Sequence, residues 1–322
     1  MKYIHQLLEE VKLDNADKLD YCPVKVGGMN KVNILALGDV GSTVLMGLRL
    51  LGGETISEIG ICDIDKSNCI RLEQEMNQID YPFGEKRLPT IKTVSEGDLF
   101  DGDVLVFCAS KRVPPIGEGG DVRMAQLDAN REIIAHYGKL AKEKNYQGLI
   151  AIVSDPVDPL CKEMLKASGL RPSQIKGYGL GVMNTRAKYF AEKMGAVHYE
   201  SQGRAFGPHG RDLVIADSIS NYDDALSKEI TEKTVNANVK LRELGFKPYM
   251  APAISSAAIS ILLTMQGQWH YSSVYLGDSA GGAFLGIKNR LRKDGTEYED
   301  LLVCDELYNR IKGAYLNLCE IK

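Results

Sequence analysis

No apolar stretch of this 322-residue sequence approaches the roughly 20 residues that a helix needs to cross a membrane. Long basic runs are missing too, and the formal net charge is −4, so nothing in the composition indicates nucleic-acid binding. The N-terminus lacks the apolar core and the small-residue cleavage site of a signal peptide. The seven cysteines are irregularly spaced and odd in number, which disfavours a disulfide framework. We therefore expect a cytoplasmic protein with no membrane or nucleic-acid partner and no bound metal.

What the chain does contain is ordinary for a globular protein, with 44% hydrophobic and 25% charged residues. Its length suits two domains that share an interface. We divide it into an N-terminal arm (residues 1–30), a first domain (31–165) and a second domain (166–322). The arm contains a short amphipathic helix candidate, Ile4–Val11, and it either packs on a neighbouring subunit or is a frayed terminus.

Residues 31–65 predict a strand, a glycine turn, a helix and a second strand that ends in an acid. The apolar run 32–37 is short and rich in β-branched residues, as in a buried strand. A tight turn follows at 38–42, a helical pattern spans 43–51, and the second strand ends at Asp63. This order is typical of a βαβ unit that binds a dinucleotide. An ordinary tight turn between a strand and a helix is the alternative.

The turn residues have separable physical roles in such a unit. Gly38 lets the backbone approach a pyrophosphate, and Gly41 lets the helix pack closely on the strand while its free N–H groups face the phosphates. Asp63 can accept hydrogen bonds from a ribose diol and would repel a 2′-phosphate, which favours NAD over NADP. The first glycine of the usual motif is replaced by Ala36, the smallest available substitute.

Further apolar runs extend this unit into an α/β domain. Strands are predicted at 103–109 and 148–154, and helices at 67–79 and 122–144. Strands that alternate with helices predict a doubly wound parallel sheet. The segment 110–121 is rich in Gly and Pro and too polar for a core. A loop of that length in a compact domain is usually functional, often as a lid.

The second domain has a mixed α+β pattern. Its strands alternate apolar and polar residues, and a strand meander is predicted from Tyr271 onward. Its other predicted elements are strands at 198–201 and 213–216 and helices at 227–244, 253–265 and 305–318.

Several short motifs follow one another in a distinctive order. They are the turn 36–41, Asp155-Pro156-Val157-Asp158, the run 165–170, Arg186 and His209-Gly210. In order and spacing they resemble the lactate/malate dehydrogenase family of NAD-dependent L-2-hydroxy acid dehydrogenases, from about residue 32 to the C-terminus. The resemblance implies a Rossmann-type domain that binds NAD, followed by an α+β substrate domain, in a divergent member of the family.

The resemblance also implies a role for individual residues. His209 would exchange the hydroxyl proton as acid or base, because an imidazole titrates near neutral pH. Arg186 would bind the substrate carboxylate as a planar bidentate partner, and Arg123, next to the long loop, would polarise the substrate carbonyl once the loop closes. The implied cofactor contacts are Gly38, Asp39, Val40, Gly41, Asp63, Ala109, Asn130 and Ser154.

The sequence departs from the family where the histidine should have a carboxylate partner. The aspartate expected three residues before Arg186 is Met183, or Asn184 if one residue has been deleted nearby, and neither is charged. Conversely, the family's asparagine before Pro-Val-Asp is Asp155 here. Three explanations are open. Asp155 is a relocated partner of His209, or the pocket binds another kind of substrate, such as a cationic one, or only NAD binding remains.

The residue that selects the substrate is ambiguous because segment 110–121 is longer than the family pattern. Arg112 is one candidate and would favour a dicarboxylate, whereas Glu118 is the contrary candidate. Met250 is expected to line the pocket wall. We therefore predict an NAD-dependent oxidoreductase acting on a small 2-hydroxy/2-keto acid. The alternative is a catalytically weak NAD-binding protein with a regulatory or structural role. The resemblance further implies a homodimer or homotetramer with helix 67–79 at a subunit contact.

Overall fold

The computed structural model describes residues 1–13, 19–111, 122–246, 251–278 and 280–321, except for the side chains of 122–125. Within these residues a nine-stranded sheet has the order β12-β11-β10-β7-β6-β5-β2-β3-β4. Its strands are β2 (Asn30–Leu35), β3 (Ile56–Cys62), β4 (Thr90–Thr93), β5 (Val104–Phe107), β6 (Leu149–Ile152), β7 (Ile175–Gly177), β10 (His270–Gly277), β11 (Gly282–Arg292) and β12 (Gly295–Tyr298). The strands from β4 to β7 are parallel, and β10 to β12 extend the sheet antiparallel.

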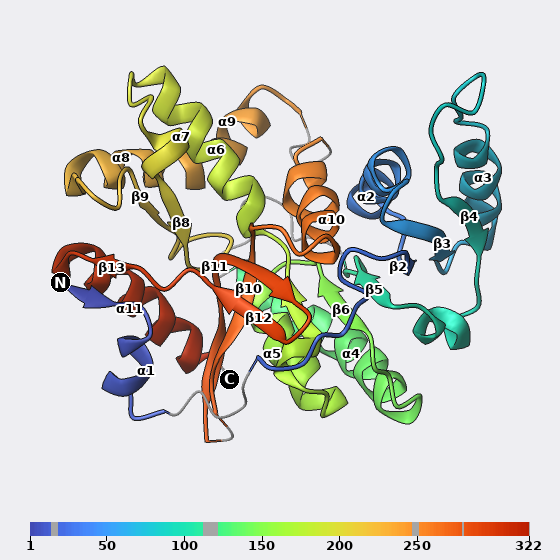
Figure 1. The fold of residues 1–322 in the computed structure, drawn as a ribbon, viewed down its shortest axis with the longest axis horizontal. Helices are drawn as coiled ribbons and strands as arrows, with labels where there is room; N and C mark the ends of the chain where they lie inside the picture. The colour runs from blue at the N-terminus through green and yellow to red at the C-terminus, as the bar shows by residue number, and fades with distance from the viewer. Residues whose placement is uncertain (14–18, 112–121, 247–250, 279, 322) are drawn as a thin grey trace.

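Helices cover both faces of this sheet, so the predicted doubly wound α/β fold is confirmed (Figure 1). The helices are α1 (Gln6–Glu10), α2 (Asp39–Leu51), α3 (Lys66–Asn77), α4 (Val122–Glu143), α5 (Val157–Ser168), α6 (Leu180–Lys193), α7 (Tyr199–Gln202), α8 (Asp224–Val235), α9 (Ala237–Glu243), α10 (Ser260–Met265) and α11 (Asp305–Glu320), with 3₁₀ turns at Glu96–Asp101 and Pro172–Gln174 and a π-helical turn at Ile254–Ile259. Among the described residues, no helix combines the length and the apolarity that a membrane crossing requires.

The parallel strands are apolar throughout because both of their faces are buried. Val104 and Val106 of β5 pack on the same side as α2 and α10, whereas Leu105 and Phe107 pack on the side of α4 and α5. Successive side chains of a strand point to opposite faces, so a strand covered on both sides is a continuous apolar run. The boundary predicted at residue 165 lies inside α5, and the last parallel strand, β7, follows it. The division into domains stays a prediction.

The N-terminal arm packs on the C-terminal part of its own chain. Strand β1 (Lys2–Tyr3) pairs with β13 (Leu302–Val303), and Ile4, Leu7 and Leu8 are buried in the cluster that contains α11. In Figure 1 the blue arm lies beside the red C-terminal helix, at the end of the molecule opposite to α2 and α3. The first turn of the arm buries apolar side chains within the chain and is not frayed, whereas its packing on a neighbouring subunit stays a prediction.

Three predicted elements of the second domain differ from the structure. The predicted strand 198–201 is the helix α7, because four residues are too few to separate a period of 2 from one of 3.6. The predicted helix 227–244 is two helices that meet at Asn236. The predicted helix 253–265 begins as a π-helical turn.

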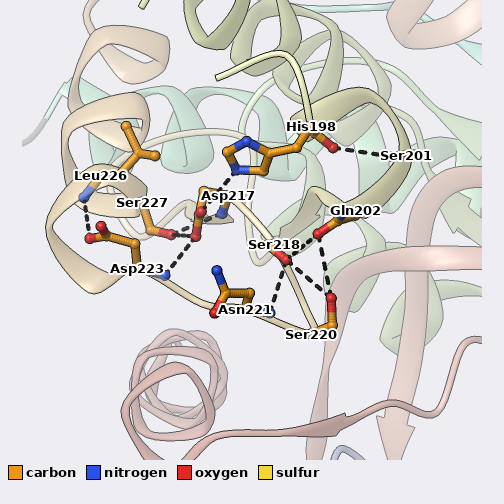
Figure 2. A network of polar contacts seen from close by, with 10 residues as sticks. All are labelled: His198, Ser201, Gln202, Asp217, Ser218, Ser220, Asn221, Asp223, Leu226 and Ser227. Atoms are coloured by element: carbon orange, nitrogen blue, oxygen red, sulfur yellow. Dashed lines mark hydrogen bonds and ion pairs between the residues drawn. The ribbon is translucent and has the colours of Figure 1, made fainter. Parts of the chain in front are cut away.

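A polar network around the buried Asp217 connects the start of α7 to the segment that follows β9 (Val214–Ala216) (Figure 2). Nε2 of His198 lies 3.1 Å from Oδ2 of Asp217, which is buried. Oδ1 of Asp217 accepts hydrogen bonds from the Ser227 hydroxyl at 2.8 Å and from the backbone N–H of Asp223 at 2.9 Å. Asp217 therefore holds α7 and the start of α8 together. Strand β9 pairs with β8 (Arg204–Phe206), which leads to His209.

Candidate functional site

The carboxyl ends of β2, β3 and β5 lie side by side at one edge of the sheet. Leu35, the last residue of β2, is in register with Cys62 of β3 and with Phe107 of β5. The glycine turn, Asp63 and the segment that starts at Cys108 therefore leave the sheet together. Ligands of open α/β sheets bind at this edge.

The geometry of the turn between β2 and α2 explains why the residues of this turn are small. A Cβ on Gly41 would stand 1.9 Å from the carbonyl oxygen of Ala36, so only glycine fits there. Ala36 has a φ of +70°, a left-handed conformation that costs a residue with a Cβ roughly 1–2 kcal/mol. A Cβ on Gly38 would meet no atom within 4 Å. The backbone of Gly38 is therefore open on this side, next to the N-terminus of α2, which begins with Asp39 and Val40 and where an anion such as a pyrophosphate is favoured.

Asp63 lies beside this turn. Its Oδ2 accepts a hydrogen bond from the backbone N–H of Leu37 at 2.5 Å, and its Oδ1 accepts one from the N–H of Asp65 at 2.9 Å. These two bonds hold the carboxylate next to the glycine turn. A ribose that follows a pyrophosphate at the turn would reach a carboxylate in this position.

Replacing Gly38 by Ala is expected to weaken NADH binding at least about tenfold, a loss of about 1.4 kcal/mol, with little change in thermal stability. The backbone of Gly38 has a φ of −68°, which alanine adopts freely, and the added methyl group meets no protein atom. Fluorescence titration with NADH and a thermal melt measure the two effects. Gly41→Ala is the contrasting variant and should lower stability, because its methyl group collides with Ala36. If the Gly38→Ala variant bound NADH with unchanged affinity, the assignment of the pyrophosphate to this turn would be wrong.

Ser154 bonds to Ala109 just after β6 and β5, and Asn130 of α4 bonds to the segments that follow these two strands. The Ser154 hydroxyl donates to the carbonyl oxygen of Ala109 at 2.8 Å. The fully buried Asn130 accepts a hydrogen bond from the backbone N–H of Lys111 at 2.8 Å and donates one to the carbonyl oxygen of Asp155 at 3.0 Å. These hydrogen bonds fix the backbone of the segments that follow β5 and β6, including that of Asp155.

His209 and Asp155 meet in a small cavity between the two halves of the chain. Nδ1 of His209 lies 3.0 Å from Oδ1 of Asp155. The cavity, of about 50 Å³, is lined by both residues, by Val40 of the glycine turn, and by Arg186 and Ser256. A proton-exchanging group, a carboxylate and a guanidinium are thus gathered next to the open space at α2. Such a set can bind an acidic substrate and exchange one proton with it.

The two positions that should have carried the family aspartate do not contact His209. Met183 is buried, and its Sδ lies 3.6 Å from Nη1 of Arg186. Asn184 accepts a hydrogen bond from the Tyr199 hydroxyl at 3.1 Å and lines a different cavity, of about 340 Å³. The other end of the Arg186 guanidinium donates to Oδ1 of Asn238 at 2.9 Å. Asp155 is therefore the carboxylate that pairs with His209.

Four predicted site residues cannot be placed. Arg112, Glu118 and Met250 lie outside the described residues, as does most of the predicted loop 110–121. Arg123 belongs to the first turn of α4, but its side chain is not among those described.

Two buried residues at the site or near Asp155 in the chain were not predicted as site residues. Ser256 is buried in the π-helical turn and lines the cavity, and π-helical turns are frequent at functional sites. No periodicity in the sequence signals such a turn. Asp158 is buried in the first turn of α5, three residues after Asp155, and burial raises the pKa of its carboxyl to about 6. Its place in the Asp-Pro-Val-Asp motif was the available signal.

Residues 30–177 match the family model of the lactate/malate dehydrogenase NAD-binding domain. The L-lactate dehydrogenase of Mycoplasma pneumoniae is 30% identical over 184 residues, which are 56% of this chain and 56% of that enzyme. The chain therefore matches little more than half the length of that relative. The malate dehydrogenase of Sulfurimonas denitrificans is 27% identical over 291 residues, which cover 83% of this chain and 86% of that enzyme.

Solved structures share the fold over nearly the whole chain. The minor L-lactate dehydrogenase of Enterococcus mundtii superposes with a TM-score of 0.75 at 20% identity and covers 91% of this chain and 98% of its own. The malate dehydrogenase of Picrophilus torridus gives a TM-score of 0.73 at 21% identity, over 89% and 94% of the two chains. The chain is therefore similar to lactate and malate dehydrogenases, in sequence over residues 30–177 and in fold over most of its length.

Proposed function

We propose that the protein is an NAD-dependent dehydrogenase that interconverts a small 2-hydroxy acid and its 2-keto acid. The observation that supports this proposal is that His209, its partner Asp155 and Arg186 line one cavity beside the glycine turn. The match of residues 30–177 to the family model and the open space beside Gly38 support the proposal as well.

Each polar group of the cavity has a task in this reaction. Bound NAD would supply the nicotinamide ring that accepts a hydride from C2 of the hydroxy acid. Arg186 would hold the substrate carboxylate through two parallel N–H donors. His209 would take the hydroxyl proton as the C2–H bond breaks, and Asp155, 3.0 Å from Nδ1, would orient the ring and stabilise the imidazolium. In the reverse direction the imidazolium returns the proton to the carbonyl oxygen.

A steady-state screen of NADH oxidation tests this function. The substrates are 2-keto acids that differ in size and charge, each compared with an analogue that lacks the keto group. Turnover should require the keto acid and should vanish in His209→Gln, which should still bind NADH. If the wild-type protein binds NADH but turns over none of the acids, the competing function, an NAD-binding protein without catalysis, is the better one.

The cofactor preference follows from Asp63. We expect tighter binding of NADH than of NADPH, because the carboxylate beside the turn repels a 2′-phosphate. Asp63→Ser removes this charge and should reduce the preference at least about tenfold, a change of about 1.4 kcal/mol. Titrations of both proteins with both nucleotides measure it. Equal affinities in the wild-type protein would contradict the assignment of Asp63 to the ribose diol.

We also propose that copies of the chain associate into a homodimer or homotetramer. Large apolar side chains are exposed on α2 (Leu50) and α3 (Ile70), and after α9 Leu244 and Phe246 are 70% and 68% exposed. A cavity of about 1020 Å³ lies between α6 and α9. A second copy would bury this apolar surface, and the family resemblance favours α3, predicted at 67–79, as part of the contact.

Sedimentation at micromolar concentration is expected to give at least twice the 35.5 kDa of one chain. The double variant Ile70→Ser, Phe246→Ser should shift the protein toward the single-chain mass, because both exposed side chains would lose an apolar partner. A wild-type protein that sediments as one chain across this range contradicts the proposal.

A further inference from the structure

Asn238 contacts the residue that is proposed to bind the substrate carboxylate, and it has no part in the reaction described above. Its Oδ1 accepts a hydrogen bond from Nη2 of Arg186 at 2.9 Å. The two residues are 52 positions apart and belong to different helices, Arg186 to α6 and Asn238 to the first turn of α9. The guanidinium is therefore held by a group from outside its own helix.

Two contacts of the Arg186 guanidinium are with uncharged groups. Nη1 lies 3.6 Å from Sδ of Met183, one turn earlier in α6, and Nη2 bonds to Asn238. The five N–H donors of a guanidinium are enough for both contacts and for a bidentate carboxylate. A long arginine side chain loses rotamer freedom when it binds an anion, and contacts that fix it beforehand reduce this cost.

Arg186 lines two cavities, whereas Asn238 lines only one of them. Arg186 borders the small cavity that contains His209 and also the cavity of about 1020 Å³ between α6 and α9. Asn238 borders the larger cavity and not the smaller one. The hydrogen bond thus holds the guanidinium from the side of the larger cavity.

Helix α9 adds nothing to the hydrophobic core. None of its residues is buried, and Val239 and Leu241 are 51% and 42% exposed. Asn238 itself is half-buried. Because no core packing depends on this position, we expect substitutions of Asn238 to leave the fold intact.

We propose that Asn238 is a positioning residue that holds the Arg186 guanidinium in place for the substrate carboxylate without neutralising its charge. An amide oxygen accepts a hydrogen bond, as a carboxylate oxygen does, but it carries no net charge. The guanidinium therefore keeps its attraction for an anion. The inference rests on the proposed function, since it takes the anion to be a 2-keto acid. The alternative is a purely structural connection between α6 and α9.

Two substitutions separate position from charge. Asn238→Ala removes the hydrogen bond and should raise the KM of the keto acid about tenfold. Asn238→Asp keeps the shape and the acceptor but pairs the guanidinium with a negative charge, and it should raise KM about 100-fold. In both variants kcat should stay within about threefold of the wild type. The charge of the substrate carboxylate does not change during the reaction, so a contact with it acts equally on substrate and transition state.

Asn236→Ala is the matched control, because this exposed asparagine lies two residues away, where α8 and α9 meet. It should leave KM and kcat unchanged. A purely structural connection predicts a different order, since Asn238→Asp keeps the acceptor for Arg186 and would have a normal KM. The proposal is overturned if the KM of either Asn238 variant is lower than that of the wild type or within about twofold of it.

Equilibrium binding distinguishes a failure of this inference from a failure of the proposed function. Calorimetric titration of the NAD⁺-loaded protein with pyruvate and with oxaloacetate measures carboxylate binding without reaction, because NAD⁺ has no hydride to give to a keto acid. Affinity should fall from the wild type to Asn238→Ala and further to Asn238→Asp. If this order is found in a protein that turns over no keto acid, the proposed function alone is wrong. Equal affinities in an active enzyme would contradict only the role of Asn238, and a wild-type protein that binds neither acid would contradict both.

Discussion

Replacing Asp155 by Asn is expected to lower kcat by about 10³–10⁴-fold, the loss seen when a serine-protease triad receives the same change. The amide keeps the shape of the side chain and can still hydrogen-bond Nδ1 of His209, which lies 3.0 Å away. It lacks the charge that stabilises the imidazolium and fixes the tautomer. NADH binding should hardly change, because the glycine turn and Asp63 are untouched. Single-turnover kinetics and an NADH titration measure the two quantities.

Two companion variants sharpen this test. His209→Gln should abolish turnover as well. Asn184→Asp, made in the Asp155→Asn background, restores one version of the family pattern but should not rescue activity, because Asn184 bonds to Tyr199 and lines another cavity. Normal turnover in Asp155→Asn together with none in His209→Gln would show that Asp155 is not the partner. If neither variant alters a measured activity, this cavity is not where a dehydrogenase reaction occurs.

Replacing Lys176 by Met is expected to raise the free energy of unfolding at pH 7 by about 2–4 kcal/mol. Lys176 of β7 is 1% exposed, and burial lowers the pKa of its ammonium group from 10.5 to about 7. At pH 7 this shift costs the folded state about 4 kcal/mol. Its hydrogen bond to Oδ1 of Asn289, at 2.9 Å, recovers about 1 kcal/mol. Methionine fills the same space without a charge.

The pH dependence gives the same prediction a second readout. Between about pH 7 and pH 10 the unfolded chain binds more protons at Lys176 than the folded one, so wild-type stability should rise with pH relative to Lys176→Met. Urea unfolding at several pH values measures the difference. The control is Lys166→Met, the same change at a side chain that is 53% exposed, and it should alter stability by less than about 0.5 kcal/mol. A less stable Lys176→Met protein would mean that the Asn289 bond outweighs the buried charge.

Many features of the first half of the chain could be predicted because they depend on residues close together in the sequence. The strands at 32–37, 103–109 and 148–154 were predictable from continuous apolar runs, since parallel strands are buried on both faces. The second domain was harder to predict, since its elements are short and apolar on one face only. Segment 198–201 is the example, because four alternating residues fit one helical turn equally well.

The candidate site was predictable only in part. The motif around Asp155 and the turn around His209 made them candidates for a pair, and their ring and carboxylate are in contact, although their catalytic roles stay predictions. Asn184 was one of two positions in the sequence where the family's aspartate was expected. It contacts Tyr199 instead, because the direction of a side chain on a helix depends on which face the helix buries.

The sequence by itself determined the α/β fold, the glycine turn and the resemblance to lactate and malate dehydrogenases. The periodicity of apolar residues and the close approach of Gly41 to Ala36 both involve residues that are near one another in the sequence. A short segment is therefore enough to predict them. Only the tertiary structure decided that Asp155, and not Asn184, lies against His209 and that Lys176 is buried against Asn289. Residues 54 and 113 positions apart meet because the sheet and its helices pack, and no periodicity along the chain encodes such a contact.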